Sequence, residues 1–512
     1  MSEYFYVTTP IYYPNDVPHI GSAYTTLACD ALARFKRLDG YNVKFLTGTD
    51  EHGQKVAKAA AAAGMSPQEF VDKYSQSFRA LSELMNFSND DFIRTTEPRH
   101  HKASQALWQT LRANDEIYED NYGGWYAVRD EAFYGEDELT ERDGKKFAPS
   151  GAEVEWVEEP SYFFRLSKWQ EPLLKFYNDH PDFIAPQSRR NEVISFVKSG
   201  LKDLSVSRTT FKWGVPVPDD EKHVMYVWID ALTNYLTALG YPDATPDMKN
   251  FWPIALHMVG KDILRFHAVY WPAFLMAAEL LPPKRIFAHG WWTVEGEKMS
   301  KSLGNVIAPH HLVETYGVDP TRYFLLREVP FGNDGMFSHA QMIARINAEL
   351  ANNLGNLIQR TLSFIQKNAE AKIPTPGEYT AADTALFDQI ETTLPTVRTH
   401  MDAQEFHKAL EAIINLSNAA NVYIDEQAPW TLKKTDPARM VTVLYVLCEV
   451  IRNLGLLFLP FTPDAATKIL DAVGVERGAR TFASYGLASR LSPLAPLPAP
   501  TPIFPRYENK AA

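Results

Sequence analysis

The N-terminal part of the chain alternates between strand-like and helix-like spacing of apolar residues. Residues 4–9 have strand composition, a turn follows at residues 10–18, and a helical pattern runs from Gly21 to about Arg37. A second strand-like run, Val43 to Thr47, comes next, and helical patterns then continue to about Asn114. This β-α-β order predicts an α/β chain built on a Rossmann-type, doubly wound parallel sheet.

The pattern changes between residues 115 and 225, where short β-like runs are separated by Gly-Gly, Asp-Gly and Pro-Ser-Gly turns. We interpret this acidic, aromatic segment as a mostly β connective insertion. Sheet-type runs resume at Ile254–Val259 and Arg285–Ala288, with a helix expected between them at about Ile263–Leu281. Residues 226–335 are therefore expected to supply the second half of the sheet that residues 1–114 begin.

The remaining residues, 336–512, have helical periodicity almost throughout, which predicts an all-α bundle. The Pro-rich end, Leu491 to Pro505, is expected to lie on the surface as an extended segment. The predicted helices of the bundle are Ile343–Lys367, Ala382–His400, Gln404–Glu426 and Ala438–Phe458.

Composition supports a folded protein with several domains. The chain has 512 residues, of which 45% are hydrophobic and 12% aromatic, and this length favours about two to four domains. The net charge of −12 argues against a protein that coats nucleic acid non-specifically, although a local basic surface can still hold one structured RNA. The most apolar stretch, Met440 to Phe461, contains Glu449, Arg452 and Asn453, so we expect a core helix and no membrane segment.

Cysteine usage and the N-terminus bear on the cellular compartment. Cys29 and Cys448 are the only cysteines, which excludes a disulfide framework and a four-cysteine zinc site. The first residues also lack the basic and apolar regions of a secretory signal. A cytoplasmic protein is therefore expected.

The first candidate motif for chemistry is Pro18-His19-Ile20-Gly21-Ser22, between the first strand and its helix. At such a junction the backbone N–H groups and the positive end of the helix dipole attract the phosphates of a nucleotide. His19 is placed to donate to the α-phosphate during an in-line attack. Taken alone, a turn with an incidental histidine explains the motif equally well.

The second candidate motif is Lys298-Met299-Ser300-Lys301-Ser302, on a loop flanked by Gly296 and Gly304. Its lysines can close over a triphosphate and neutralise the leaving pyrophosphate. A solvated basic turn is the alternative for a lysine pair in isolation. The position beyond a strand of the second half-sheet favours the nucleotide role.

Together the two motifs resemble the HIGH and KMSKS signatures of class I aminoacyl-tRNA synthetases, in the same order and with an insertion between the halves. Ser22 departs from the first signature, which often ends in histidine. Within this class the whole chain resembles the methionyl-tRNA synthetases. The segments that carry this resemblance are 9–15 (TPIYYPN), 47–53 (TGTDEHG), 226–231 (YVWIDA), 260–263 (GKDI), 266–267 (FH), 271–272 (WP), 288–290 (AHG) and 425–430 (DEQAPW).

The resemblance implies an ATP-dependent ligase that forms methionyl-adenylate and then charges tRNA(Met). Magnesium is expected to arrive with the ATP phosphates. The implied catalytic residues are His19, Lys298 and Lys301, and the implied ATP-binding residues are these three with Gly21, Ser22, Gly260, Asp262, His289, Gly290 and Ser300.

Methionine is a flexible thioether with few hydrogen-bonding groups, so its pocket should combine aromatic walls with one or two weak donors. The resemblance places Asp50 at the α-ammonium and Tyr13 and His267 beside the sulfur. The remaining implied pocket residues are Pro10, Ile11, Trp228, Ala231, Leu232, Tyr235, Ile263, Phe266 and Trp271. Ordinary core packing is the alternative for such scattered aromatics.

The resemblance also makes the helical bundle an anticodon-binding domain. Asn356 and Arg360, four residues apart on one helix face, and Trp430 match the family positions that meet the anticodon. A helix-start contact is the structural alternative for Trp430. Initiator and elongator tRNA(Met) are both expected as partners, and we expect a monomer.

The insertion departs from many family members, in which cysteine knuckles hold zinc. Residues 122–156 contain no cysteine, so we expect no structural zinc and no other protein-bound metal. Aromatic packing around Trp125, Tyr126, Phe133 and Tyr134 is expected to replace the metal.

Two alternatives remain at this stage. A synthetase for leucine, isoleucine or valine needs a larger editing insertion, because one methylene gives limited discrimination, and a cysteine enzyme needs pocket zinc ligands. A non-catalytic tRNA-binding protein on the same scaffold is the other alternative, which the presence of His19, Lys298 and Lys301 disfavours.

Overall fold

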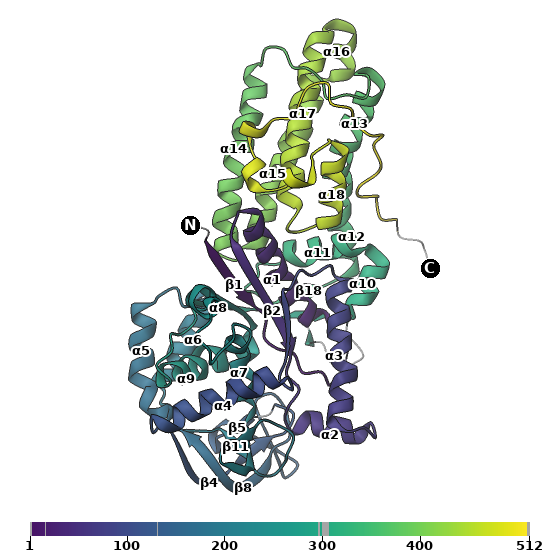
Figure 1. Ribbon diagram of the computed structural model, residues 1–512. Helices are drawn as coiled ribbons and strands as arrows, with labels where there is room; N and C mark the ends of the chain where they lie inside the picture. The colour runs from purple at the N-terminus through teal and green to yellow at the C-terminus, as the bar shows by residue number, and fades with distance from the viewer. Residues whose placement is uncertain (1–2, 16, 131, 295–296, 299–306, 509–512) are drawn as a thin grey trace.

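The computed structural model describes residues 3–15, 17–130, 132–294, 297–298 and 307–508. The β-rich insertion lies at one end of the molecule, the central sheet lies in the middle, and the helical bundle lies at the other end (Figure 1).

The central sheet is a six-stranded parallel sheet with the order β3-β2-β1-β14-β15-β9. The order runs outward in both directions from β1 and β14, so the two halves meet at the carboxyl ends of these two strands. The predicted Rossmann-type fold is confirmed. Its strands are β1 (Tyr4–Thr8), β2 (Asn42–Thr49), β3 (Asp91–Arg94), β14 (Ala255–Gly260), β15 (Arg285–His289) and β9 (Ile184–Ala185).

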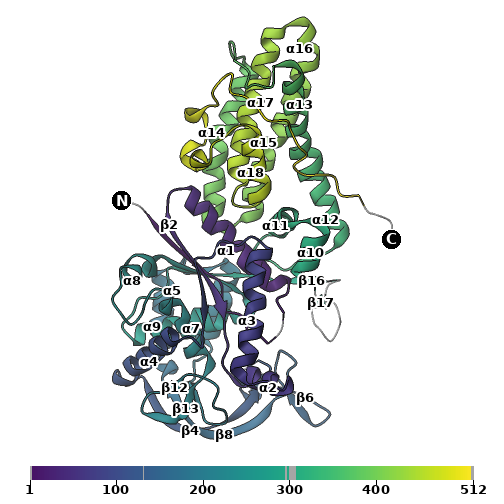
Figure 2. The same ribbon diagram turned by 45° about the vertical axis from the view of Figure 1, so that its right-hand side comes forward.

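The helices of the first half connect these strands. Helix α1 (Ile20–Leu38) follows β1 and is almost entirely buried, and it leads from the central sheet toward the bundle (Figure 2). Helices α2 (Gln54–Ala62) and α3 (Pro67–Leu84) come between β2 and β3, and α4 (Pro98–Ala113) follows β3. Ser66 and Glu69 form a capping box at the start of α3.

The predicted insertion contains two features that the sequence pattern did not indicate. Strand β9 joins the edge of the central sheet by pairing with β15, and two helices are present, α5 (Gln170–Asp179) and α6 (Gln187–Lys198). Its other strands are β4 (Ile117–Ala127), β5 (Ala132–Tyr134), β6 (Thr140–Arg142), β7 (Lys145–Phe147), β8 (Glu155–Phe164), β10 (Leu204–Ser205), β11 (Ser207–Arg208), β12 (Pro216–Val217) and β13 (Asp220–Met225).

The second half begins with α7 (Val227–Thr237) and α8 (Pro246–Phe251). The helix expected at about Ile263–Leu281 is present over residues 264–277, and it contains a π-helical turn, Phe266–Tyr270, before α9 (Trp271–Ala277). Pro272 has no N–H for the carbonyl of Ala268 four residues earlier, and the Tyr177 hydroxyl donates to that carbonyl instead, at 2.6 Å. A small sheet of β16 (Trp292–Val294), β17 (Glu297–Lys298) and β18 (Gly335–Phe337) follows.

The C-terminal part is a helical bundle, as predicted. Helix α17 (Pro437–Phe458) is long and apolar enough to span a membrane, but it is almost entirely buried inside the protein, as expected of a core helix. The helices are α10 (Pro309–Tyr316), α11 (Val318–Arg327), α12 (His339–Arg345), a π-helical stretch Ile346–Gly355, α13 (Asn356–Asn368), α14 (Ala381–Asp402), α15 (Phe406–Gln427), α16 (Pro429–Thr435), α17 (Pro437–Phe458) and α18 (Pro463–Ala472).

The Pro-rich end runs along the bundle without regular structure. Gln366 of α13 donates to the carbonyls of Leu497 and Pro498, and Phe504 is only 7% exposed. The N–H groups of Leu494 and Leu497 also donate to the carbonyls of Ile373 and Ala371, so this segment is anchored by its backbone and by single apolar side chains.

A buried ion pair joins the central sheet to the bundle. Arg322 of α11 lies 2.6 Å from Asp30 of α1, and both side chains are fully buried. The same guanidinium donates to the carbonyls of Pro460 and Phe461, between α17 and α18. Because α1 begins at the His19 motif, this contact ties the position of that motif to the bundle.

Candidate functional site

A cavity of about 770 Å³ lies at the carboxyl ends of the central strands. Ligands of open parallel sheets bind at this edge, where the strand order changes direction. Most of the predicted site residues line it, namely Pro10, Ile11, Tyr13, His19, Gly21, Ser22, Asp50, Trp228, Ala231, Leu232, Tyr235, Gly260, Asp262, Ile263, His267, His289 and Gly290.

Two predicted wall residues, Phe266 and Trp271, lie behind the cavity and do not line it. Phe266 stacks on Trp228 with ring centroids 3.6 Å apart. Trp271 is fully buried, and its ring lies 6.2 Å from that of Tyr235. Both residues therefore support the wall from its outer side.

The KMSKS-like residues are only partly described. Ser300 and Lys301 lie outside the described residues. The backbone of Lys298 belongs to β17, which pairs with β16, and its side chain is likewise outside the described part.

His19 is the N-cap of α1. The backbone N–H of Gly21 donates to Nδ1 of His19 at 3.0 Å, so in a neutral ring the hydrogen is on Nε2, which is then a donor. A side chain at position 21 would meet the His19 ring at 2.7 Å. Glycine is therefore required at this position for His19 to fold back on the helix start.

A hydrogen bond across the nucleotide side of the cavity joins α1 to β15. Oγ1 of Thr25 lies 2.7 Å from Nε2 of His289, and Nδ1 of His289 lies 2.7 Å from the carbonyl of Gly290. Burial lowers the pKa of His289, so the ring is neutral, donates through Nδ1 and accepts from the Thr25 hydroxyl. Gly290 permits close packing here, because a Cβ would lie 2.2 Å from the backbone of Asn333.

The aromatic end of the cavity contains a buried Tyr235–His267 pair. Nδ1 of His267 donates to the carbonyl of Ile263 at 2.9 Å, and its Nε2 lies 2.7 Å from the Tyr235 hydroxyl. Burial lowers the pKa of His267 to about 4, so Nε2 is an acceptor and Tyr235 donates to it. Both ring nitrogens are engaged within the protein, which leaves no N–H of His267 for a substrate sulfur.

Asp50 lines the cavity immediately after β2 and is only 2% exposed. Its backbone N–H donates to the carbonyl of Tyr12 at 2.9 Å, so the loops that follow β1 and β2 are held together. A buried carboxylate on this wall is a favourable partner for an ammonium group.

The bundle brings two of the predicted anticodon residues together. The Arg360 guanidinium lies 5.3 Å from the ring centroid of Trp430, and the same side chain forms an ion pair with Asp425 at 2.7 Å. Trp430 is 43% exposed, and Asn356 is exposed at the start of α13. This surface offers a planar cation and an aromatic face to a partner.

Comparison with known proteins identifies the family. Residues 5–362 match the family described as tRNA synthetases class I (M), and residues 373–510 match the anticodon binding domain of methionyl tRNA ligase. The methionine–tRNA ligase of Brucella suis biovar 1 is 58% identical over 506 residues, which cover 99% of this chain and 98% of the relative. The chain belongs to the methionyl-tRNA synthetases.

Further relatives of the methionyl-tRNA synthetase family agree. The Rickettsia conorii enzyme is 58% identical, with 99% of this chain and 100% of the relative covered. A structure of the Mycobacterium tuberculosis methionyl-tRNA synthetase in complex with methionyl-adenylate has a TM-score of 0.97 at 54% identity, covering 99% of this chain and 100% of that chain.

The insertion has an aromatic and alanine-rich core, where aromatic packing in place of zinc was expected. Trp125 meets Trp156 edge to face at 5.3 Å, Tyr126 is buried, and Trp125 and Tyr134 pack on a cluster of small residues. The side chain of Phe133 lies outside the described part. Across the described ranges, no group of His, Cys, Asp and Glu has a metal-binding arrangement, and the expected lack of zinc remains a prediction.

Several cavity residues were not predicted. Tyr24 and Thr25 lie one helical turn after Gly21, and Trp291 and Trp292 directly follow Gly290, so proximity to the motifs was an available signal. Asn234 lies between the predicted residues Leu232 and Tyr235 on α7, whereas Phe78 and Arg129 come from other segments that no local pattern marks. The residues that sequence analysis missed are Tyr12, Asn15, Val17, Tyr24, Thr25, Lys55, Phe78, Arg129, Asn234, Trp291 and Trp292.

Proposed function

We propose that the chain activates L-methionine with ATP to give methionyl-adenylate and pyrophosphate, and then transfers the methionyl group to the 3′-terminal ribose of tRNA(Met). The observation that carries this proposal is one continuous cavity, which joins the helix N-terminus at His19 to an aromatic pocket that contains Asp50. Its volume of about 770 Å³ suits a nucleotide with a small amino acid.

ATP lies at the α1 end of the cavity in this proposal. At the start of α1 the N–H of Ile20 donates to the Ile307 carbonyl and that of Gly21 donates to His19, so the phosphates meet the Ser22 N–H and the positive end of the helix dipole. Nε2 of His19 donates to the α-phosphate as negative charge grows on it. Gly260 and Asp262 lie near the ribose, and His289 and Gly290 lie near the adenine. Mg²⁺ arrives as part of the ATP substrate.

Methionine lies at the aromatic end. The Asp50 carboxylate holds the α-ammonium, and Trp228, Ala231, Leu232 and Ile263 surround the side chain. Because His267 donates to the Ile263 carbonyl and accepts from Tyr235, neither side chain has a hydrogen left for the thioether, and the sulfur is contacted by the aromatic and apolar walls. An apolar pocket of this kind suits a thioether, which forms only weak hydrogen bonds.

The reaction needs positioning and charge stabilisation, with no covalent enzyme intermediate. The methionine carboxylate attacks the α-phosphorus, the bond to the β-phosphate oxygen breaks, and Lys298 and Lys301 neutralise the departing pyrophosphate. The terminal ribose hydroxyl of tRNA then attacks the methionyl carbonyl, and AMP leaves.

The bundle recognises the anticodon in this proposal. Asn356 hydrogen bonds to an unpaired base, Trp430 offers a stacking face, and Arg360 is held between Trp430 and Asp425. Both initiator and elongator tRNA(Met) are accepted. The enzyme acts as a monomer in the cytoplasm and carries no structural zinc.

Methionine-dependent exchange of labelled pyrophosphate into ATP tests the activation step directly. We expect exchange with methionine and none above background with leucine, isoleucine, valine or cysteine. Exchange that depends on one of these other amino acids would contradict the methionine assignment, and no exchange with any amino acid would support the non-catalytic alternative.

A further inference from the structure

A fully buried carboxylate, Asp230, lies between two histidines outside the cavity. Its Oδ2 is 2.6 Å from Nδ1 of His52, and its Oδ1 is 2.7 Å from Nε2 of His100. Asp230 and His100 are fully buried, and His52 is 3% exposed. The cluster joins α7, α4 and the loop after β2, which are far apart in the sequence.

The carboxylate of this cluster stays ionised. Burial alone raises the pKa of Asp230, but the charges and hydrogen bonds of His52 and His100 outweigh it and hold the pKa well below its ordinary value. Hydrogen bonds to an ionised acceptor are stronger than those between neutral groups. The cluster therefore holds these three segments together strongly, and removal of one side chain leaves a buried polar or charged group without its hydrogen-bond partner.

Both partners of the Asp230–His52 contact are adjacent to residues that line the cavity. Trp228, Ala231 and Leu232 line it from α7, and Asp230 projects from another face of the same helix. His52 comes two residues after Asp50, and Asp50 lines the cavity from the loop after β2. The Asp230–His52 hydrogen bond thus connects the hydrophobic wall of the pocket to the loop that carries Asp50.

We propose that Asp230 is a positioning residue for methionine binding, which acts through His52 to fix the Asp50 carboxylate relative to the α7 wall. The proposal rests on the proposed function of the cavity. The loop has a second support, because the Trp213 indole donates to the carbonyl of Glu51 at 2.6 Å. Because this hydrogen bond keeps the loop folded when the Asp230 contact is lost, the expected defect is a displaced Asp50 carboxylate and not an unfolded loop.

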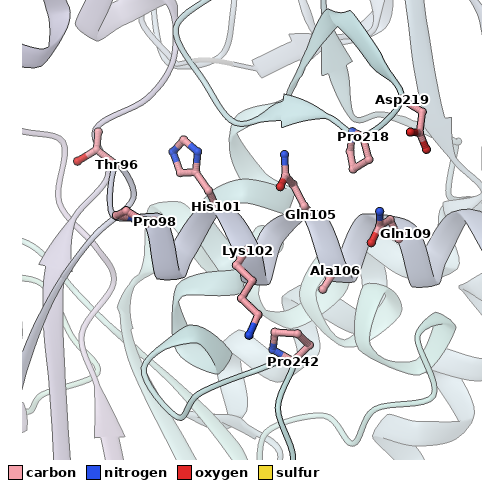
Figure 3. A pocket seen from close by; sticks show the side chains of 10 residues that line it. All are labelled: Thr96, Pro98, His101, Lys102, Gln105, Ala106, Gln109, Pro218, Asp219 and Pro242. Atoms are coloured by element: carbon pink, nitrogen blue, oxygen red, sulfur yellow. The ribbon is translucent and has the colours of Figure 1, made fainter.

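The outer face of α4 supplies matched controls. His101, Gln105 and Gln109 project from α4 into an open groove of about 790 Å³ beside Pro218 and Asp219 (Figure 3). The His101 ring lies 5.4 Å from the His52 ring, but no hydrogen bond between them occurs among the described contacts. His101→Ala and Gln109→Ala therefore alter the same region without breaking the Asp230 anchor.

Pyrophosphate exchange with separate titrations of methionine and ATP tests the proposal. We expect His52→Ala and Asp230→Asn each to raise the KM for methionine about tenfold and to change the KM for ATP less than about twofold. Asparagine places its amide nitrogen close to the position of Nδ1, so His52→Asn should restore the KM for methionine to within about threefold of the parent.

The double variant His52→Ala/Asp230→Asn tests whether the two residues act through their shared hydrogen bond or affect methionine binding independently. If both residues act through one contact, its KM for methionine should equal that of the worse single variant. Multiplied effects, equal losses for ATP and methionine, no rescue by His52→Asn, or a similar defect in Gln109→Ala would overturn the proposal.

A folding defect and an incorrect proposed function can each be distinguished from an incorrect role for Asp230. If Asp230→Asn fails to fold by near-ultraviolet circular dichroism, the His52→Ala and His52→Asn pair carries the test. A parent enzyme without methionine-dependent exchange would contradict the proposed function itself. An active parent with unchanged His52→Ala and Asp230→Asn would contradict only the role of Asp230.

Discussion

The Tyr235 hydroxyl lies 2.7 Å from Nε2 of His267, and the same ring donates from Nδ1 to the Ile263 carbonyl. Burial lowers the pKa of His267 to about 4, so these directions hold throughout the neutral range. The hydrogen of the Tyr235 hydroxyl is therefore directed at His267 before substrate enters.

Tyr235→Phe should raise the KM for methionine about five- to tenfold, because it removes a buried hydrogen bond worth roughly 1 kcal/mol and leaves His267 without its donor. The KM for ATP should change little. Tyr118→Phe is a matched control, since it removes a tyrosine hydrogen bond to Asp203 in the insertion. An unchanged KM for methionine in Tyr235→Phe would remove this hydroxyl from the description of the pocket.

Lys301→Ala should lower the rate of adenylate formation by about 100-fold or more, because a charge that acts on the leaving phosphates contributes mainly in the transition state. The dissociation constant for methionine should stay within about twofold of the parent. Single-turnover kinetics and equilibrium titration measure the two quantities. Lys284→Ala, at an exposed lysine, is the control, and equal losses in rate and affinity would contradict the assigned role.

The separation of the anticodon surface from the cavity gives a third prediction. Trp430→Ala should raise the KM for tRNA(Met) in aminoacylation by about 10- to 100-fold, since a stacked base contributes roughly 1–3 kcal/mol. Pyrophosphate exchange without tRNA should be unaffected. Tyr379→Ala tests another exposed aromatic residue of the bundle, 37% exposed against 43% for Trp430. If both variants weaken tRNA charging equally, the stacking role of Trp430 is wrong.

Local sequence signals were sufficient for much of this fold and site. The turn between β1 and α1 is a contiguous segment, so the pattern placed His19, Gly21 and Ser22 at a strand–helix junction, and the family resemblance added their expected role. Asp50 was placed by the resemblance, and the structure puts it directly after β2 on the cavity wall. The periodicity of α14, α15 and α17 likewise predicted the bundle.

Other features depend on contacts between distant segments. Phe266 and Trp271 have the composition of a pocket wall, but the π-helical turn Phe266–Tyr270, which precedes Pro272, places them behind Trp228 and Tyr235. Strand β9 is only two residues long, too short for a periodic pattern, and it forms because β15 offers it a pairing edge. The anchor at Asp230 likewise required the fold to bring α4 beside α7.

The insertion gives a prediction about metal content. Elemental analysis of the purified protein should find zinc well below one atom per chain, because residues 122–156 lack cysteine ligands and aromatic packing replaces them. Treatment with a zinc chelator, followed by restoration of Mg²⁺, should leave pyrophosphate exchange unchanged. Stoichiometric zinc, or zinc-dependent recovery of activity, would contradict this prediction.

Asp319 gives a prediction about pH and stability. It is 6% exposed, accepts a hydrogen bond from the Ala465 N–H at the start of α18, and is flanked by Arg322 and Asp464. Burial raises its pKa to about 6, although the bond from Ala465 and the charge of Arg322 oppose the shift. A carboxyl whose pKa is higher in the folded state stabilises the fold at low pH and loses this contribution as pH rises through the folded pKa.

Asp319→Asn should therefore raise the thermal unfolding midpoint at pH 7.5 and leave it nearly unchanged at pH 4. The amide oxygen still accepts the hydrogen bond from Ala465, but no charge is buried. From the size of the pKa shift, burial of the charged carboxylate costs roughly 2–3 kcal/mol of folding free energy above pH 6. This corresponds to a few degrees in the unfolding midpoint. Thermal denaturation across this pH range measures the difference. The exposed Asp388→Asn of α14 should show no such trend. A lower midpoint for Asp319→Asn at pH 7.5 would show that the ionised carboxylate stabilises the junction.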